Sequence, residues 1–418
     1  MSAYEELVEN IEKGVRGENV SLTLTENPYT KVPSKLGQRI NLGKSTYMLF
    51  GGLSGTGKTA IVDSQFVINL YLYHKYFETT VKPYWVYRSM ERPTMFKIAK
   101  WTCYLMYIHY GIRIDVPTLL QWGNKSRELS EKELQLSKGY KEWFEEFFKY
   151  MDIVQGAENP TGLRNYMFRV LNQKGTYIKA SLKGFNVNGR KAGDFNPQDK
   201  EYKNGQWKFY KDITINGEER RIYQFDNFYV PKDENEIVFH ITDHIGKLTT
   251  ERNFSDKQIL DKHSEYMGEF RDIFGVSPID VSQFNRGLED TFRRVKTQLD
   301  VLPSDFKSSG DPYENADIVI GLMNPYKLEA YNYNKYDIER FVNEAGYNRF
   351  RGMKIVKNSF GIDDFNIGYA FLGENGFMRE LHRAEDMTSQ IYNDVASGNV
   401  RWVLPETEKK KWQQKELL

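Results

Sequence analysis

The sequence predicts an α/β fold in which a mostly parallel sheet is flanked by helices and carries a β-rich insertion. Several segments are near-continuous apolar runs, which suit strands that are buried on both faces of a sheet. Helical patterns lie between these runs, and such alternation favours a parallel sheet with helices on both sides. A glycine-rich loop joins the first of these strands to the helix that follows it.

The expected elements can be placed by residue number. A short helical pattern covers Tyr4 to Ile11, and a loop-like stretch follows it. Strands are expected at 47–50, 84–87, 237–242, 277–282, 318–323, 353–356 and 367–372. Helices are expected at 60–76, 94–110, 131–150, 162–172 and 256–274.

The chain is expected to divide into an arm, a core, an insertion and a tail. Residues 1–45 form an N-terminal arm or linker, residues 46–382 form the α/β core, and residues 383–418 form a helical or frayed tail. Residues 175–235 interrupt the core as a β-hairpin insertion, because they are rich in Gly, Asn, Lys and aromatic residues. The Asn-Gly pairs in this segment are typical of hairpin turns.

Composition excludes several classes of protein. The 58 Lys and Arg residues nearly balance the 57 Asp and Glu residues, so any nucleic-acid surface must be local. The single cysteine, Cys103, excludes an internal disulfide and a cysteine-cluster zinc site. No apolar run approaches the roughly 18 residues of a membrane span, and no signal peptide is visible. We therefore expect a cytoplasmic protein without a membrane partner.

The segment from Gly52 to Thr59 fits the phosphate-loop pattern G-x-x-x-x-G-K-[ST]. Its glycines let backbone N–H groups curl around a phosphate, and the N-terminus of the next helix adds a favourable dipole. Lys58 would neutralise the β- and γ-phosphates, and the Thr59 hydroxyl would bind Mg²⁺. We expect ATP and Mg²⁺ as cofactors, with the nucleotide bound by Gly52, Ser54, Gly55, Thr56, Gly57, Lys58, Thr59 and Ala60.

Two carboxylates are candidates for the chemistry that hydrolysis adds to nucleotide binding. Asp243 follows the strand expected at 237–242, where an open α/β sheet places its ligands, and could support Mg²⁺. Glu91 follows the strand expected at 84–87 and could activate the attacking water. Each has a structural alternative, Asp243 as a turn residue and Glu91 as a first-turn helix residue favoured by the dipole.

A glutamine and a cationic run follow the strand expected at 277–282. Gln283 could sense a γ-phosphate through hydrogen bonds and relay its presence to the next loop. That loop carries cations that could contact a nucleic-acid backbone, although a solvated helix face is the alternative interpretation. The candidate cations are Arg286, Arg293, Arg294 and Lys296.

Together these segments resemble the RecA-like ATPase domain of DnaB-type replicative helicases. The resemblance covers roughly residues 33–382 apart from the insertion, and the motifs keep the family's order. They are Ser89-Met90-Glu91, Ile241 to His244, Ser282 to Arg286, Ser304 to Gly310 followed by Ala316-Asp317, and Lys357 to Gly361.

The resemblance implies roles for these residues and an assembly. Glu91, Lys58 and Gln283 would be catalytic, Asp243 would support the metal, and Lys357 would reach the γ-phosphate of a neighbouring subunit. Six subunits would form a ring with nucleotide between them and single-stranded DNA in the channel. A primase or a loader would be a further partner.

The chain departs from the family in three places. Ser359 stands where the family has its trans-acting arginine finger. Either Lys357 works alone, hydrolysis is weak, or another arginine substitutes; the candidates are Arg349, Arg351 and Arg379. Residues 111–235 exceed what the core requires. No room precedes Gly52 for the family's helical N-terminal domain, which makes the chain look like a bacteriophage-encoded variant.

The predicted function is that of an ATP-dependent DNA helicase that translocates on single-stranded DNA in replication. A RecA-family ATPase that switches an assembly without unwinding is the alternative, and Ser359 favours it. A DNA-packaging motor would need a nuclease domain, for which too few residues follow Leu372. A nucleotide-binding structural protein remains as a non-enzymatic alternative, which ATP turnover would exclude.

Overall fold

The structure, a computed structural model, describes residues 3–16, 18–156, 158–203, 205–285 and 299–416. Within these residues the central sheet has nine strands, in the order β20-β19-β18-β15-β3-β14-β13-β4-β5. Its strands are β3 (Met48–Gly52), β4 (Lys82–Ser89), β5 (Met151–Gln155), β13 (Glu236–Asp243), β14 (Ser277–Gln283), β15 (Ile318–Met323), β18 (Phe350–Asn358), β19 (Phe365–Leu372) and β20 (Phe377–Glu380).

The strands from β15 to β5 run parallel to one another, whereas β18, β19 and β20 are antiparallel to their neighbours. The predicted α/β class and mostly parallel sheet are therefore confirmed. Each predicted strand is present in this sheet, and the sequence missed β5 and β20.

The register brings the carboxyl ends of four parallel strands to one edge of the sheet. Gln283 at the end of β14 pairs with Gly52 at the end of β3. Asp243 at the end of β13 pairs with Ser89 at the end of β4. Because the ends of these strands are level, the loops that follow them surround a common space.

Close packing against β3 requires a glycine in the strand. A Cβ atom added to Gly51 would lie 2.3 Å from the ring of Phe306 and 2.4 Å from the ring of Phe284. Met48, Leu49 and Phe50 before it are fully buried. The strand that leads into the glycine-rich loop is thus fully buried and in close contact with two aromatic rings.

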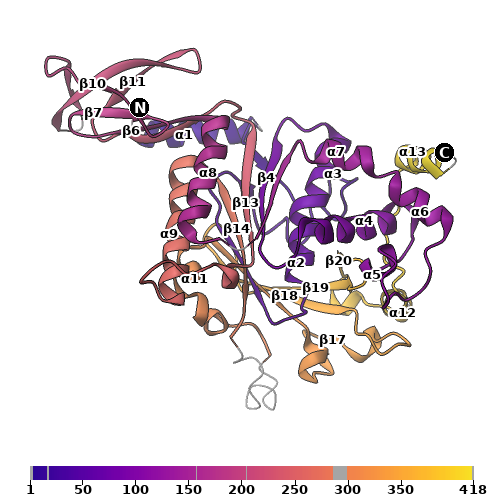
Figure 1. The fold of residues 1–418 in the computed structure, drawn as a ribbon. Helices are drawn as coiled ribbons and strands as arrows, with labels where there is room; N and C mark the ends of the chain where they lie inside the picture. The colour runs from indigo at the N-terminus through magenta and orange to yellow at the C-terminus, as the bar shows by residue number, and fades with distance from the viewer. Residues whose placement is uncertain (1–2, 17, 157, 204, 286–298, 417–418) are drawn as a thin grey trace.

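Helices cover both faces of the sheet, with α8 and α9 on one side and α3 and α4 on the other (Figure 1). The predicted helix at 131–150 is wrong as a single element, because it is broken at Gly139 and Tyr140. The break turns the Tyr140 ring into the core, where its hydroxyl lies 3.0 Å from His109 Nδ1. The helices are α2 (Lys58–Ile61), η1 (Val62–Ile68, a π-helix), α3 (Asn69–Phe77), α4 (Thr94–Tyr110), α5 (Val116–Leu119), α6 (Glu131–Lys138), α7 (Lys141–Phe147), α8 (Pro160–Lys174), α9 (Asp256–Phe274) and α11 (Gly310–Asn315).

The β-rich insertion projects from the core (Figure 1) and has its own small core of six buried apolar side chains. It is more than the hairpin that the sequence predicts, since it forms two antiparallel sheets, β12-β6-β7-β8 and β11-β10-β9. Its strands are β6 (Gly175–Ala180), β7 (Gly184–Val187), β8 (Arg190–Asp194), β9 (Lys200–Lys203), β10 (Gln206–Ile215), β11 (Glu218–Tyr223) and β12 (Asn227–Pro231).

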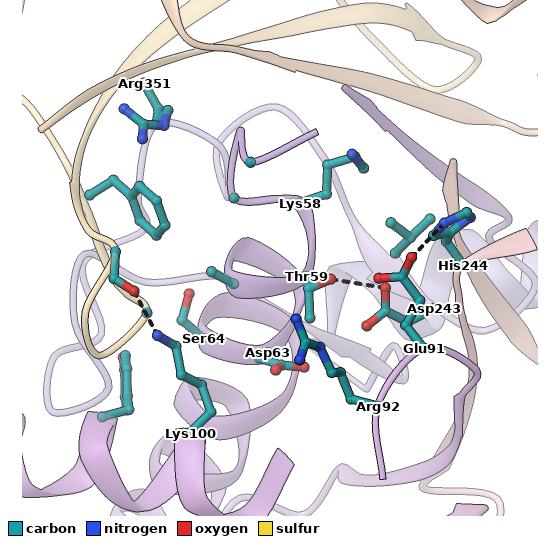
Figure 2. A pocket seen from close by; sticks show the side chains of 18 of the residues that line it. Lys58, Thr59, Asp63, Ser64, Glu91, Arg92, Lys100, Asp243, His244 and Arg351 are labelled. Carbon is teal, nitrogen blue, oxygen red and sulfur yellow. Dashed lines mark hydrogen bonds and ion pairs between the residues drawn. The ribbon is translucent and has the colours of Figure 1, made fainter. Parts of the chain in front are cut away.

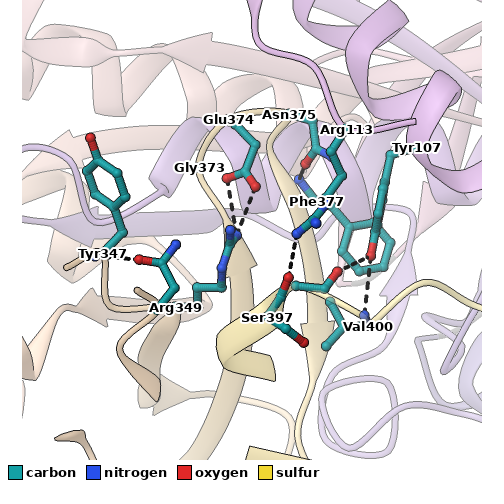
Figure 3. A network of polar contacts seen from close by, with 12 residues as sticks. Tyr107, Arg113, Tyr347, Arg349, Gly373, Glu374, Asn375, Phe377, Ser397 and Val400 are labelled. Atoms are coloured by element: carbon teal, nitrogen blue, oxygen red, sulfur yellow. Dashed lines mark hydrogen bonds and ion pairs between the residues drawn. The ribbon is translucent and has the colours of Figure 1, made fainter. Parts of the chain in front are cut away.

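The C-terminal segment contains α12 (Ser389–Ser397), which packs on the turn at Glu339–Phe341, and α13 (Glu406–Glu416), which packs on α4 and α6. The Trp412 ring stacks on His109 with 3.7 Å between ring centroids. Figure 3 shows the polar contacts of this segment, in which the Tyr107 hydroxyl donates to the Gly398 carbonyl at 2.7 Å. None of the described helices combines the length and apolarity that crossing a bilayer requires.

Short elements complete the described chain. At the N-terminus, α1 (Ala3–Val15) leads to the strands β1 (Ser21–Leu22) and β2 (Leu42–Gly43). The others are β16 (Asn332–Tyr333), β17 (Tyr336–Asp337) and the 3₁₀ turns η2 (Ile245–Lys247), η4 (Pro303–Ser309), η5 (Pro325–Leu328), η6 (Glu339–Phe341) and η7 (Ala384–Asp386).

Candidate nucleotide site

The glycine-rich loop lies between the end of β3 at Gly52 and the start of α2 at Lys58, as the motif predicts. Gly55 and Gly57 have φ angles of 74° and 97°, a left-handed conformation that side chains other than glycine rarely adopt. Thr56 is buried, and its hydroxyl donates to the Leu53 carbonyl at 2.9 Å. The loop therefore has the backbone that a phosphate cradle needs.

The Lys58 side chain folds back over the loop. Its Nζ donates to the carbonyls of Gly52 at 2.8 Å and Leu53 at 3.0 Å. Burial lowers the pKa of this ammonium to about 8, against the opposing pull of Asp243 and Glu91. A phosphate group that came to Lys58 would supply the negative charge that favours the ammonium form.

The structure brings the two predicted metal-binding residues into contact, since the Thr59 hydroxyl donates to Asp243 Oδ1 at 2.9 Å. Mg²⁺ is usually held by one or two carboxylates and by substrate phosphates rather than by an all-protein cage. The hydroxyl and carboxylate fit that donor set. The described residues contain no cluster of three or more His, Cys, Asp or Glu that could hold a metal.

A buried polar cluster that the sequence did not predict orients Asp243. Lys97 Nζ lies 3.1 Å from Asp243 Oδ2 and 3.2 Å from Asp63 Oδ2. The Tyr87 hydroxyl lies within hydrogen-bonding distance of both carboxylates, at 2.8 Å from Asp63 and 3.1 Å from Asp243. Burial acts to lower the pKa of Lys97, but the two aspartates outweigh it and raise that pKa. Lys97 is therefore held as a cation between two carboxylates.

Glu91 contacts His244, the residue that follows Asp243. Its Oε1 lies 2.9 Å from His244 Nε2, and its side chain is 43% exposed to solvent. The strand β4 ends two residues before Glu91, and β13 ends at Asp243, so the two paired strands deliver both groups. Gln283 also lies at this edge and is exposed.

A cavity of about 600 Å³ contains these groups and matches the size of small-ligand pockets. Figure 2 shows Thr59 joined to Asp243, Glu91 joined to His244, and Arg351 at the side away from both pairs. The lining residues that the sequence predicted are Ser54, Gly55, Gly57, Lys58, Thr59, Ala60, Glu91, Asp243 and Gln283.

Arg351 is a cation in the cavity wall with no carboxylate partner among the described residues. One guanidinium nitrogen donates to the carbonyls of Asn348 and Phe350, and the guanidinium carbon lies 4.7 Å from the centroid of the Phe371 ring. Burial lowers the pKa of Arg351 to about 10. Lys327 lies nearby, with Nζ 2.9 Å from where a Cβ on Gly55 would stand.

The other arginines considered as substitutes for a finger have structural partners. Arg349 forms an ion pair with Glu374 at 2.9 Å (Figure 3). Arg379 donates to the Val400 carbonyl at 3.2 Å. In the described part of the chain, neither contributes to the wall of the cavity around Lys58.

Lys357 lies far from its own phosphate loop. It pairs with Val319, which pairs with Leu49 near the amino end of β3, whereas the loop follows the carboxyl end. Its Nζ donates to the Glu314 carbonyl at 2.7 Å. Ser359 follows β18 and is exposed.

The predicted nucleic-acid contacts Arg286, Arg293, Arg294 and Lys296 lie outside the described residues. They stay predictions. The preceding strand β14 delivers the chain from Gln283 to this loop.

Comparisons with known proteins agree on the fold. A solved ATPase domain is similar over 91% of this chain and 100% of that chain, with a TM-score of 0.55 and 14% identity. A DnaB-like replicative helicase, solved in a study of its interactions with primase, is similar over 91% of this chain and 67% of that chain, with a TM-score of 0.53 and 14% identity. No protein-family model matches the sequence, and no curated protein matches it. The chain has the RecA-like fold of DnaB-type ATPase domains, and the predicted resemblance is confirmed at the level of the fold.

Proposed function

We propose that this chain is an ATP-dependent DNA helicase that translocates on single-stranded DNA in replication. The observation that carries the proposal is the contact between Thr59 and Asp243 at the end of a phosphate loop, with Glu91 in the same cavity. Mg²⁺, when bound, would stabilise charge on the transferred phosphoryl group. Thr59 and Asp243 would hold it, and Lys58 would neutralise phosphate oxygens.

Glu91 is the proposed group that orients and deprotonates the attacking water. Its contact with His244 at 2.9 Å keeps the carboxylate beside the metal-binding strand. Gln283 pairs with Gly52, so a displacement of the phosphate loop would move the end of β14 and, through it, the cationic segment that follows. This is the proposed route from nucleotide state to DNA contact.

A ring of subunits, proposed as a hexamer, is supported by two features. Lys357 lies at the edge of the sheet away from its own loop, so it could serve a nucleotide only on a neighbouring subunit. The N-terminal helix α1 also exposes an apolar stripe that includes Tyr4, Leu7 and Ile11. A neighbouring subunit would cover that stripe. A primase or loader as a further partner is part of the proposal.

An ATPase that switches an assembly without unwinding is the second candidate. Ser359 favours it, because a serine cannot stabilise the charge that an arginine finger would. Arg351, which lines the cavity of its own subunit, could supply part of that charge without a neighbour.

ATP turnover with and without single-stranded DNA, measured together with particle mass, separates these candidates. A helicase predicts turnover that DNA stimulates and a mass of six subunits. Lys58→Ala is the control that should abolish turnover. A monomer whose turnover ignores DNA would refute the helicase, and a protein without any turnover would refute the enzyme. Ser359→Arg adds one measurement: a large gain in rate would mean that the native site lacks a finger.

A further inference from the structure

The tip of the insertion carries two exposed aromatic side chains that face each other. Tyr202 on β9 and Trp207 on β10 are directly opposite in the antiparallel pair, with exposures of 61% and 62%. Their ring centroids lie 5.6 Å apart in an edge-to-face arrangement. Large apolar groups that adjoin one another on a surface mark a site of interaction more often than isolated ones do.

The strand register places this pair far from the core. The Asn216 side chain after β10 donates to the Pro231 carbonyl, and Pro231 pairs with Gly175 where the insertion joins α8. From that base β10 runs back over ten residues to its other end, a span of about 33 Å. Trp207 is the second residue of β10, at the end of the strand that is far from the core, so the aromatic pair lies at the tip of the insertion.

Lysines lie on both faces of the two strands that carry the aromatic pair, with Lys200 on the face of the rings and Lys203 and Lys208 on the other face. Lys200 Nζ lies 5.5 Å from the centroid of the Trp207 ring, and Lys203 Nζ lies 4.0 Å from that of Tyr223. Within the described residues, neither lysine nor Lys208 forms an ion pair, whereas Arg221 pairs with both Glu201 at 3.2 Å and Asp212 at 2.8 Å. Residues 175–231 hold ten lysines and arginines against seven acids. The insertion as a whole therefore carries a net positive charge, to which the three lysines of the tip contribute.

We infer that this tip, defined by Tyr202, Trp207, Lys200, Lys203 and Lys208, binds single-stranded nucleic acid. Unstacked bases stack on aromatic rings in any sequence, and lysines contact the backbone phosphates. An alternative role for these lysines is to prevent edge-to-edge association of sheets, which charged residues on edge strands often do. That role does not explain why two aromatic rings are exposed beside them. The tip stands on a different sheet from the nucleotide cavity, so the inference goes beyond the proposed motor and does not depend on unwinding.

Fluorescence anisotropy with a labelled dT oligonucleotide of about 15 nucleotides tests the inference on the full chain. Tyr202→Ala with Trp207→Ala should weaken binding by at least about fivefold, as expected when stacking is lost. Lys200→Gln with Lys203→Gln should flatten the slope of log K against log salt by about 1.4. Tyr331→Ala, which removes an aromatic ring that is 63% exposed elsewhere, is the matched control and should change neither quantity.

Tryptophan fluorescence gives a readout that belongs to the tip alone. Added dT should quench part of the emission of the parent protein, and Trp207→Phe should remove that part while circular dichroism shows the fold intact. The same quenching should persist in Lys58→Ala, which should remove ATP turnover. Loss of the proposed ATPase activity can therefore be distinguished from loss of nucleic-acid binding at the tip. An oligonucleotide of rU should quench to a similar extent, because stacking does not read the sugar. Unchanged affinity and unchanged quenching in the tip variants would overturn the inference and assign the pair to a protein partner instead.

Discussion

Replacing Lys97 with methionine would remove the cation that lies between Asp63 and Asp243. The ammonium contacts both carboxylates and the Tyr87 hydroxyl, which lies 2.6 Å away, and the Lys97 side chain is only 4% exposed. Breaking a buried ion pair by removing one partner costs about 3–5 kcal/mol, because the remaining charge stays buried and unpaired. Here two carboxylates would remain, so we expect a loss at the upper end of that range.

A loss of about 5 kcal/mol is large against the roughly 5–15 kcal/mol that stabilises a typical domain. The urea midpoint of unfolding should therefore fall markedly in Lys97→Met, and the variant should need more Mg²⁺ for half-maximal ATP turnover, because Asp243 loses the group that orients it. Lys100→Met is the matched control for the unfolding measurement. Lys100 lies three residues further along α4 and, among the described residues, donates to the carbonyls of Gly373 and Glu374 rather than to a carboxylate.

A double-mutant cycle with Asp63→Asn isolates the interaction. The loss of unfolding free energy in the double variant should be smaller than the sum of the two single losses by about 0.5–3 kcal/mol. The reason is that both members of one ion pair are then absent. A Lys97→Met protein that unfolds within about 0.5 kcal/mol of the parent, with an unchanged Mg²⁺ requirement, would refute the assigned role.

Three further predictions address the cavity, the assembly and the core. Arg351→Met should weaken ATP binding by about tenfold or more, as expected for a lost charged hydrogen bond; a fall in stability with unchanged ATP affinity would make Arg351 structural instead. Leu7→Lys with Ile11→Lys should lower the particle mass measured by light scattering if α1 docks on a neighbour, whereas Lys13→Gln, on the side of the helix opposite the apolar stripe, should not. Burial would raise the pKa of Asp280, but the charge of His263 and hydrogen bonds from His263 and Tyr47 hold it below its usual 3.8. Ionised Asp280 therefore stabilises the fold above about pH 3.8, and this contribution is lost as pH falls through the lower folded value. The urea midpoint of Asp280→Asn should accordingly change less than that of the parent between pH 5 and pH 3; equal changes would contradict the assignment.

The sequence predicted the parts of the site that follow from local pattern. Asp243 and Glu91 could be placed because each follows a buried apolar strand, and the glycine loop could be placed by its spacing. Lys97 could not, because a lone lysine in an apolar helix has no periodicity and its Asp243 partner lies 146 residues away. Only the tertiary packing of α4 against β13 and β4 brings the two together.

The antiparallel strands limited the prediction in a different way. Arg351 was one of three arginines that the sequence could not rank, and it reaches the cavity because β18 runs opposite to β15. Because β18 is antiparallel to β15, its amino end, which carries Arg351, lies at the edge of the sheet where the parallel strands have their carboxyl ends. Strand direction is set by the connections between strands rather than by the residues of the strand itself, so hydrophobic pattern alone could not reveal it.

The separation of Lys357 from the phosphate loop constrains the symmetry of any assembly in which both act on one nucleotide. An isologous twofold dimer joins one surface patch to its own copy, so it brings Lys357 of one subunit to the loop of the other only if both lie on that one patch. A heterologous, head-to-tail contact joins them from two separate patches, and it either closes on itself or grows as an open filament. In an open array the terminal loop faces no lysine, whereas closure completes every site. Activity per subunit should therefore rise with closure, even if no residue changes its conformation.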